Sequence, residues 1–192
     1  MHSRPASDRR TTPQFASRSG GRRACALAIG MLLAFSASDT FAADETVAVS
    51  ETVDLAASPA RTWRAIKDFD RWQSWHPAFA GTSIVKGASN RTGEVRVLAA
   101  KDGAKFTEEL VSHDSTTRSY EYRILESPLP IANYVSKLEV QARHPGSHVI
   151  WSSTFQVNAG ASAAEVKKII SGVYRTGLNN LPAVVSAPSS TY

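Results

Sequence analysis

The sequence predicts an α+β domain in which a curved antiparallel sheet of seven strands wraps around one long C-terminal helix. Seven runs alternate apolar and polar residues, and the last six follow one another on short connections, which is typical of an antiparallel meander. One apolar stripe at three- and four-residue spacing near the C-terminus predicts the long helix. A single antiparallel sheet must bury one face, and this helix is the main apolar element available to cover it.

The first 42 residues have the pattern of a secretory signal peptide. Six arginines precede the apolar run 24–37, and Thr40-Phe41-Ala42 offers small residues for cleavage after Ala42. The apolar run is too short for a comfortable membrane span. The pairs Arg9-Arg10 and Arg22-Arg23 leave both the general and the twin-arginine export route open. We therefore expect secretion into a bacterial periplasm and no membrane span in the mature chain.

Removal of this segment changes the chemistry of the remaining chain. The segment carries six arginines and two aspartates, so the mature protein has a formal charge near +1 rather than +5. A near-neutral domain gives little support to nucleic-acid binding. The only cysteine, Cys25, also lies in the segment, so the mature chain has no disulfide and no thiolate ligand or nucleophile. We expect one domain over residues 43–185 and a disordered tail over residues 186–192.

The first elements after the segment are a strand and two short helices. Residues 46–56 alternate valine and leucine with polar residues. Ser58-Pro59 is a helix N-cap followed by proline at the first helical position, and Trp63 and Ile66 give that helix an apolar face. Residues 68–75 read as a second short helix that ends at His76-Pro77.

Six strands and the long helix complete the chain. The predicted strands are 80–86, 94–100, 105–113, 118–125, 131–143 and 148–157. The helical pattern covers residues 162–185, and we expect Pro182 to end or kink it. Gly172 and Gly177 inside this helix each cost about 1 kcal/mol relative to alanine. Close backbone approach, or space left for another molecule, would explain them.

The connection Ser127-Pro128-Leu129-Pro130 is an unusual hairpin loop. Ordinary hairpin turns are polar and use Asn-Gly or Asp-Gly. Proline fixes φ and removes a donor, so this loop is rigid and cannot extend the ladder. Leu129 is therefore held at its tip, and the loop either closes over an apolar cavity or packs against its own domain.

Several short motifs together resemble a known superfamily. They are Ser58-Pro59-Ala60 with Trp63; Asp68-Phe69 with Trp72, Trp75 and His76-Pro77; Glu108 and Leu110 before Asp114; Tyr122-Arg123-Ile124; Leu129-Pro130 with Asn133-Tyr134; Trp151 with Phe155; and Gly172-Val173-Tyr174-Arg175 with Gly177-Leu178. In this order and spacing they resemble the START-like, or helix-grip, superfamily, and within it the SRPBCC group of polyketide cyclase/dehydrase and lipid-transport proteins. The resemblance covers residues 45–185.

The resemblance implies a cavity between helix and sheet for a hydrophobic small molecule or lipid. By strand order, residues 100–104 and 127–131 take the places of the gate and latch loops of the plant hormone receptors in this superfamily. The chain lacks the receptors' own loop sequences, so hormone binding is not implied. The chain also resembles the secreted MxaD-type proteins, which are accessories of periplasmic methanol oxidation. That resemblance implies a second kind of function, docking on a periplasmic dehydrogenase or cytochrome.

Glu108 is the candidate polar group of the cavity. On a two-residue period it shares a strand face with Phe106 and Leu110. Burial there would raise its pKa unless a cation lies nearby. The alternative is that the strand twists, so that Glu108 is solvated and Glu109 points inward.

Two strands and the helix supply the other candidates. Tyr122 and Ile124 share a face, as do Tyr134 and Ser136, and aromatic rings with one polar tip suit an apolar ligand with a few heteroatoms. The alternative is that the tyrosines are core residues with bonded hydroxyls, and a helical apolar stripe is likewise core by default. The predicted ligand-binding set is Glu108, Leu110, Tyr122, Ile124, Leu129, Ile131, Tyr134, Ser136, Ile169, Val173 and Gly177.

A lid is predicted from Trp72, Trp75 and His76 together with Pro128 and Pro130. A general base needs a partner that orients it, and the sequence shows none for His76, which we expect to order the turn before Pro77. The sequence contains no metal-ligand spacing, Gly-rich phosphate loop or serine elbow. We therefore expect a binding protein without metal or cofactor rather than an enzyme. The enzymatic alternative is a cyclase or hydrolase that uses Glu108 and Tyr122.

Overall fold

The computed structural model describes residues 46–187 of the 192-residue chain. The predicted signal peptide lies outside the described residues, as does the predicted tail beyond Ala187. In chain order the elements are β1 (Thr46–Leu55), α1 (Pro59–Ile66), the 3₁₀ turn η1 (Trp72–Ser74), β2 (Phe79–Lys86), β3 (Val95–Ala100), β4 (Lys105–Asp114), β5 (Ser119–Glu126), β6 (Ile131–Arg143), β7 (Gly146–Val157) and α2 (Ala163–Ser186).

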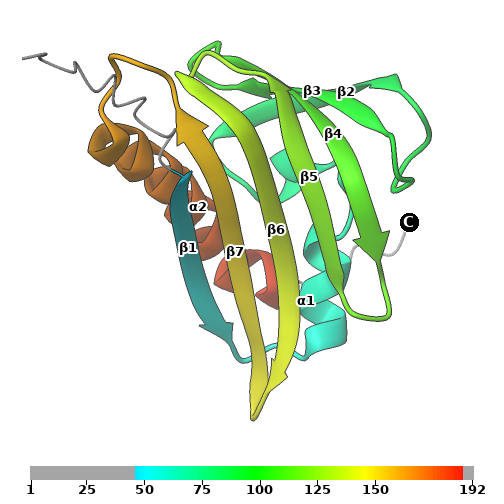
Figure 1. Cartoon of the computed structure of the whole chain (residues 1–192). Coiled ribbons are helices and arrows are strands. Elements are labelled where there is room, and N and C mark those ends of the chain that lie inside the picture. The colour runs from blue at the N-terminus through cyan, green and yellow to red at the C-terminus, as the bar shows by residue number, and fades with distance from the viewer. Residues whose placement is uncertain (1–45, 188–192) are drawn as a thin grey trace, which may run out of the picture. The chain divides into compact units, whose positions relative to one another are not determined.

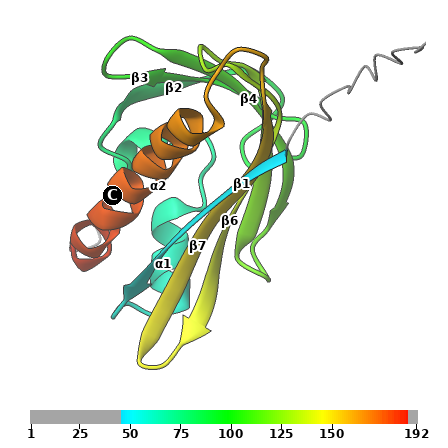
Figure 2. The same cartoon turned by 60° about the vertical axis from the view of Figure 1, so that its left-hand side comes forward.

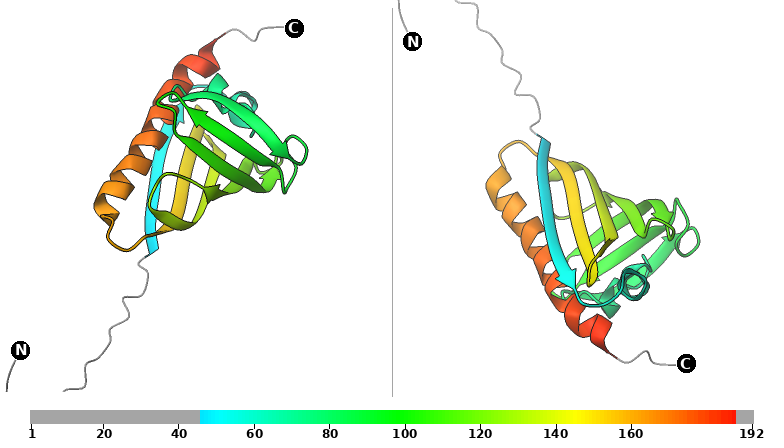
Figure 3. Two further views of the ribbon diagram at one scale, coloured as in Figure 1. Left: turned by 90° about the horizontal axis from the view of Figure 1, so that it is seen from above. Right: turned by 90° about the horizontal axis from the view of Figure 1, so that it is seen from below.

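The seven strands form one antiparallel sheet in the order β1-β7-β6-β5-β4-β3-β2 (Figure 1). The sheet curves, and both helices lie on its concave side (Figure 2). The long helix α2 runs beside β1 at one end of the sheet (Figure 3), while the opposite end, β2 to β4, bends over toward it. The predicted α+β helix-grip architecture is therefore confirmed, including the number and direction of the strands.

Helix starts follow the predicted capping chemistry. Ser58 Oγ accepts a hydrogen bond from the Arg61 amide at 3.4 Å, and Pro59 occupies the first turn of α1. Ser162 Oγ does the same for the Glu165 amide of α2 at 3.3 Å. Each cap supplies a partner to an amide that has none within its own helix.

One local prediction was wrong, and one of the two outcomes expected at Pro182 did not occur. The second short helix is reduced to η1, because the backbone of Phe69 is held by distant groups: its amide donates to Asn90 Oδ1 at 3.0 Å, and its carbonyl accepts from the Arg96 guanidinium. The long helix does not end at Pro182 but continues to Ser186. There the Arg61 side chain donates to the carbonyl of Val185 at 2.5 Å, which gives the last turn a partner.

The core between sheet and helices is mainly aromatic. Trp72 and Trp151 are fully buried and meet edge to face, with ring centroids 5.1 Å apart. Trp151 stacks on Tyr174 of α2 at 4.1 Å. These rings tie α2 to the middle of the sheet and form the floor of the space described next. Among residues 46–187 no helix is both long and apolar enough to cross a membrane.

Candidate functional site

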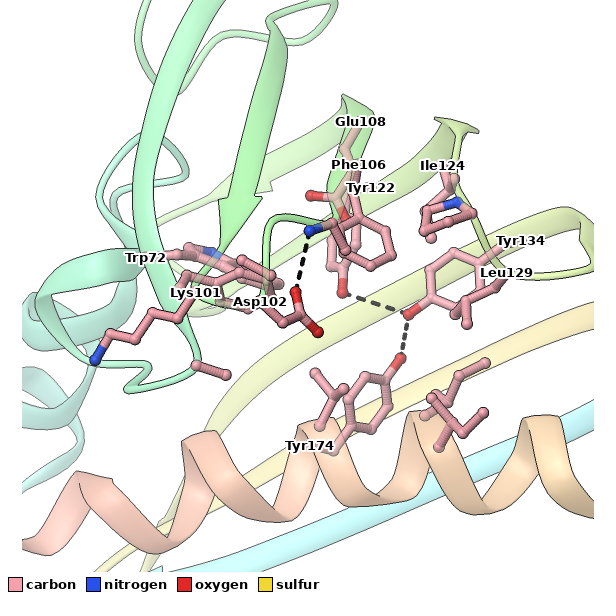
Figure 4. Close-up of a pocket in the computed structure, with 18 of the residues that line it drawn as sticks. Trp72, Lys101, Asp102, Phe106, Glu108, Tyr122, Ile124, Leu129, Tyr134 and Tyr174 are labelled. Atoms are coloured by element: carbon pink, nitrogen blue, oxygen red, sulfur yellow. Dashed lines mark hydrogen bonds between the residues drawn. The ribbon is translucent and has the colours of Figure 1, made fainter.

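A pocket of about 500 Å³ lies between the concave face of the sheet, α2 and two loops (Figure 4). The sheet contributes Phe79, Ala100, Phe106, Glu108, Tyr122, Ile124, Tyr134 and Trp151, and α2 contributes Ile169, Ile170, Val173 and Tyr174. The lining is mostly apolar, and its polar atoms come from the tyrosine hydroxyls and Glu108 on the sheet and helix, and from two charged loop residues. Ile169 is 48% exposed, so it lies at the rim rather than in the floor.

The two loops are the β3–β4 turn, residues 101–104, and the β5–β6 loop, residues 127–130. Asp102 Oδ1 accepts from the Ala104 amide at 3.0 Å, which fixes the first loop. Ser127 Oγ accepts from the Leu129 amide at 2.9 Å, which fixes the second. The Leu129 side chain lines the pocket and packs against the core. The tip of the stiff loop therefore faces inward.

Glu108 is paired with a cation inside the protein. The register of β3 and β4 places Arg96 directly opposite Glu108, and both side chains are buried. Arg96 Nε donates to Glu108 Oε2 at 2.8 Å, and Nη2 lies 2.5 Å from the same oxygen. The guanidinium is enclosed by the rings of Phe69 and Trp72, whose centroids lie 3.7 and 3.8 Å away. Arg96 thus supports the carboxyl group from behind the pocket wall.

The charge state of Glu108 follows from this pairing. Burial raises the pKa of Glu108, and the charge and hydrogen bond of Arg96 oppose that rise. Arginine does not lose its proton in proteins, so a neutral Glu108 would leave a buried cation without a counter-ion. The pair is therefore present as carboxylate and guanidinium near neutral pH.

Three tyrosine hydroxyls form a chain across the pocket (Figure 4). Tyr122 Oη lies 3.5 Å from Tyr134 Oη, which in turn bonds Tyr174 Oη. Tyr174 Oη lies 3.1 Å from Ser136 Oγ, and Ser136 donates to the Ser152 carbonyl at 2.8 Å. Burial raises the pKa of the Tyr122, Tyr134 and Tyr174 hydroxyls, so all three remain protonated at neutral pH.

His76 lies behind the pocket and joins two segments of its wall. Its Nε2 lies 2.9 Å from the Val173 carbonyl, and its Nδ1 lies 3.3 Å from the Ala78 amide. A carbonyl only accepts and an amide only donates, so this arrangement requires the neutral ring with its proton on Nε2. Burial lowers the pKa of His76 to about 4. With both nitrogens engaged, the ring has no free atom for proton transfer.

Nine residues of the predicted ligand-binding and lid sets line the pocket. Trp72 forms part of its floor, and the other eight are Glu108, Tyr122, Ile124, Pro128, Leu129, Tyr134, Ile169 and Val173. Leu110 lies in the core, and Ser136 lies behind the tyrosine chain. Ile131 packs at the core's edge and lines a separate surface groove between β5 and β6. Gly177 packs under His76.

The tryptophans and His76 do not form the predicted lid. Trp72, Trp75 and His76 are all buried to at least 99% and pack on one another beneath the pocket. Their burial results from contacts with Trp151 of β7, which is far along the chain, and with Phe79 at the start of β2. Pro130 does not line the pocket; its carbonyl accepts from the Asn158 amide at 2.9 Å.

Arg96 is the main residue that the sequence reasoning missed. The sequence could have revealed it, because a hairpin turn centred on Asp102 pairs residue 96 with residue 108 across the two strands. Tyr174 and Trp151 were also missed as lining residues, although both lie within the quoted motifs. Within residues 46–187 no group of three or more His, Cys, Asp or Glu side chains is arranged to hold a metal ion.

Comparison with known proteins places this geometry in context. A family model described as "Polyketide cyclase / dehydrase and lipid transport" matches residues 46–186. No curated protein sequence matches the chain. A solved protein from Thermobifida fusca is 31% identical with a TM-score of 0.63, and covers 73% of this chain and 93% of its own. The protein XoxI from Bacillus cereus is 29% identical with a TM-score of 0.65, over 73% of this chain and 95% of its own.

A more distant structure shows the fold alone. Ara h 8.0201 is 20% identical with a TM-score of 0.64, and covers 75% of this chain and all of its own. At this identity the likeness concerns the arrangement of sheet and helix and carries nothing about a ligand.

Proposed function

The chain belongs to the polyketide cyclase/dehydrase and lipid-transport family of the START-like superfamily, and we propose that it is a carrier or sensor of a hydrophobic small molecule. The ligand occupies the pocket between the sheet and α2. With the N-terminal signal-peptide pattern, the proposed place of action is the bacterial periplasm.

The observation that carries this proposal is the apolar pocket bordered by a stiff loop whose leucine faces inward. A volume of about 500 Å³ lies within the range of roughly 300–1,000 Å³ that is typical of small-molecule sites. Such sites are mostly apolar with a few fixed polar groups, as Glu108 and the tyrosine hydroxyls are here. Burial of a ligand's apolar surface would supply the free energy of binding.

The geometry favours binding over catalysis. A general base needs an accessible atom within hydrogen-bond reach of the substrate, and both nitrogens of His76 are already bonded behind the wall. Burial raises the pKa of the three tyrosine hydroxyls, so they are weaker acids than a free phenol and no phenolate is present at neutral pH to act as a base. A cyclase or hydrolase remains the second candidate, because Glu108 and Tyr122 both line the pocket. Loss of turnover in the charge-balanced variant Arg96→Met/Glu108→Gln with ligand affinity retained would favour it.

The inward orientation of Leu129 also weighs against the docking function. An accessory that used this loop to contact a dehydrogenase would present the leucine to solvent, whereas Leu129 lines the pocket. The proposal therefore assigns the loop to ligand closure.

Fluorescence of the neutral apolar probe N-phenyl-1-naphthylamine tests the proposal. We expect saturable binding to the wild-type protein and a loss of at least about tenfold in affinity for Val173→Trp, because the indole fills space in the pocket. Val85→Trp, on an exposed position of β2, is the matched control and should bind like the wild type. Absence of saturable binding, or equal affinity in both variants when both are folded by circular dichroism, would contradict the proposal.

A further inference from the structure

The hydroxyl hydrogens of the tyrosine chain point in one direction, which is set by the Ser152 carbonyl at the end of the chain away from the pocket. The Ser152 carbonyl can only accept, so the Ser136 hydrogen points at it. Ser136 Oγ then offers only lone pairs, which accept from Trp151 Nε1 at 3.1 Å and from the Tyr174 hydroxyl at 3.1 Å. Tyr174 has thereby used its only hydrogen.

The same reasoning continues toward the pocket. Tyr174 can only accept from Tyr134, so the Tyr134 hydrogen points at Tyr174. Tyr134 in turn can only accept from Tyr122, across 3.5 Å. Tyr122 Oη accepts from Trp151 Nε1 at 3.2 Å, so the single indole hydrogen is shared between Tyr122 and Ser136. Each hydroxyl hydrogen is directed along the chain toward the Ser152 carbonyl. The oxygens of the chain therefore offer lone pairs rather than hydrogens, and only the loosely held Tyr122 hydrogen is free to turn.

Glu108 adds a second acceptor of the same kind. Both contacts from Arg96 fall on Oε2, and within residues 46–187 no side chain donates to Oε1. Glu108 lines the pocket, and Figure 4 shows its carboxylate beside the tyrosine rings. Arg96 itself is fully buried between Phe69 and Trp72 and is not part of the lining. A ligand thus meets the carboxylate oxygen and not the guanidinium.

The inner wall of the pocket therefore presents hydrogen-bond acceptors with almost no donors. We propose that the pocket selects uncharged hydrophobic molecules that carry a hydrogen-bond donor, such as alcohols and phenols, and rejects carboxylates and ethers of the same shape. The donor group lies against Glu108 and the tyrosine oxygens, and the apolar body extends toward Leu129 and Ile169 at the rim. This inference rests on the proposed function and names the ligand class of the same pocket.

Charge and desolvation together give this selectivity. A ligand carboxylate at the inner wall would face the Glu108 carboxylate, and like charges in a site of low dielectric repel. An ether of the same shape would leave Glu108 Oε1 desolvated without a partner, which is costly for a charged acceptor. The donors near the pocket are at its mouth, where Lys101 is exposed, so an anionic group is accommodated there at best.

Three fluorescent probes with one four-ring apolar body test the inference at pH 7: 1-hydroxypyrene, 1-methoxypyrene and pyrene-1-carboxylate. We expect the wild-type protein to bind 1-hydroxypyrene at least about tenfold more tightly than either of the others. A smaller preference over the ether or the carboxylate, or none, would overturn the inference and leave the proposed function standing. If none of the three binds, the proposed function fails, and the inference fails with it.

Variants locate the selectivity. Glu108→Gln alone would leave Arg96 buried without a counter-ion, so the test variant is Arg96→Met/Glu108→Gln, which removes both charges. We expect its preference for 1-hydroxypyrene over 1-methoxypyrene to fall below about threefold, because the amide can also donate to the ether. Glu109→Gln, the next residue of the same strand and paired with exposed Arg123, should keep the wild-type preference. An undiminished preference in the double variant would overturn the assignment to Glu108.

Discussion

Two glycines in α2 provide a matched pair for testing how the helix is packed. Alanine at Gly172 would gain helix propensity of about 1 kcal/mol, because an added Cβ meets no atom within 4 Å. At Gly177 the same Cβ would overlap His76 Cδ2 and would lie 2.9 Å from His76 Nε2 and 2.9 Å from Trp75 Cζ3. These are rigid rings that are almost fully buried, so they cannot move aside.

The size of the second effect can be worked out from these contacts. Overpacking of this kind costs about 1–3 kcal/mol. Displacement of the His76 ring would also weaken its bond to the Val173 carbonyl, which costs about 1 kcal/mol more. After the propensity gain is subtracted, we expect Gly177→Ala to lower the free energy of unfolding by about 1–3 kcal/mol.

Urea denaturation followed by tryptophan fluorescence measures both variants, since all four tryptophans are buried. A typical urea m-value of about 1–3 kcal/mol/M places the midpoint of Gly177→Ala on the order of 1 M below that of the wild type. The midpoint of Gly172→Ala should rise. If Gly177→Ala unfolds at or above the wild-type midpoint, the packing of Gly177 against His76 is refuted.

Two further predictions concern buried ionisable groups. His76 has a pKa of about 4 when folded and about 6.5 when unfolded, so its contribution to the free energy of unfolding is complete above pH 6.5 and should fall by about 3 kcal/mol as the pH drops toward 4. Urea midpoints should depend less on pH over this range for His76→Gln, whereas the exposed control His144→Gln should follow the wild type. Arg96→Met should destabilise the fold by about 3–5 kcal/mol, because it leaves the buried Glu108 carboxylate without a counter-ion. The control Arg123→Met removes an exposed ion pair and should destabilise the fold by no more than about 1 kcal/mol in the same assay.

The alternation and spacing of apolar residues within each segment were sufficient to predict the strands and the long helix. The predicted strand 131–143 coincides with β6, and the other strands agree to within two residues at each end, because alternation is a property of the segment itself. The predicted helix over residues 68–75 failed for the opposite reason. The backbone of Phe69 bonds to Asn90 and Arg96, which lie 21 and 27 residues away, and no local pattern contains those partners.

The pocket was predictable to the extent that it depends on strand faces. Two-residue spacing placed Glu108, Tyr122 and Tyr134 on the inner side of the sheet, where the structure has them. The fold of the segment with Trp72 and Trp75 depends on contacts with Trp151 of β7 and Asn180 of α2, which lie far along the chain. The sequence reasoning therefore assigned both tryptophans to the mouth of the pocket, although they lie beneath it. The direction of the hydroxyl hydrogens depends on the Ser152 carbonyl, a backbone atom that a side-chain pattern does not reveal.

The Arg96–Glu108 pair carries an energetic argument about the site. Removing two charges from water costs several kcal/mol per ion, and apolar residues of similar volume often replace such a pair with no loss of stability. Stability alone is therefore a weak reason for an ion pair at this position. The arrangement has a more specific consequence, because Arg96 keeps Glu108 ionised while the Phe69 and Trp72 rings hide the guanidinium. It maintains a bare acceptor inside an apolar pocket, which a hydrophobic replacement would not provide.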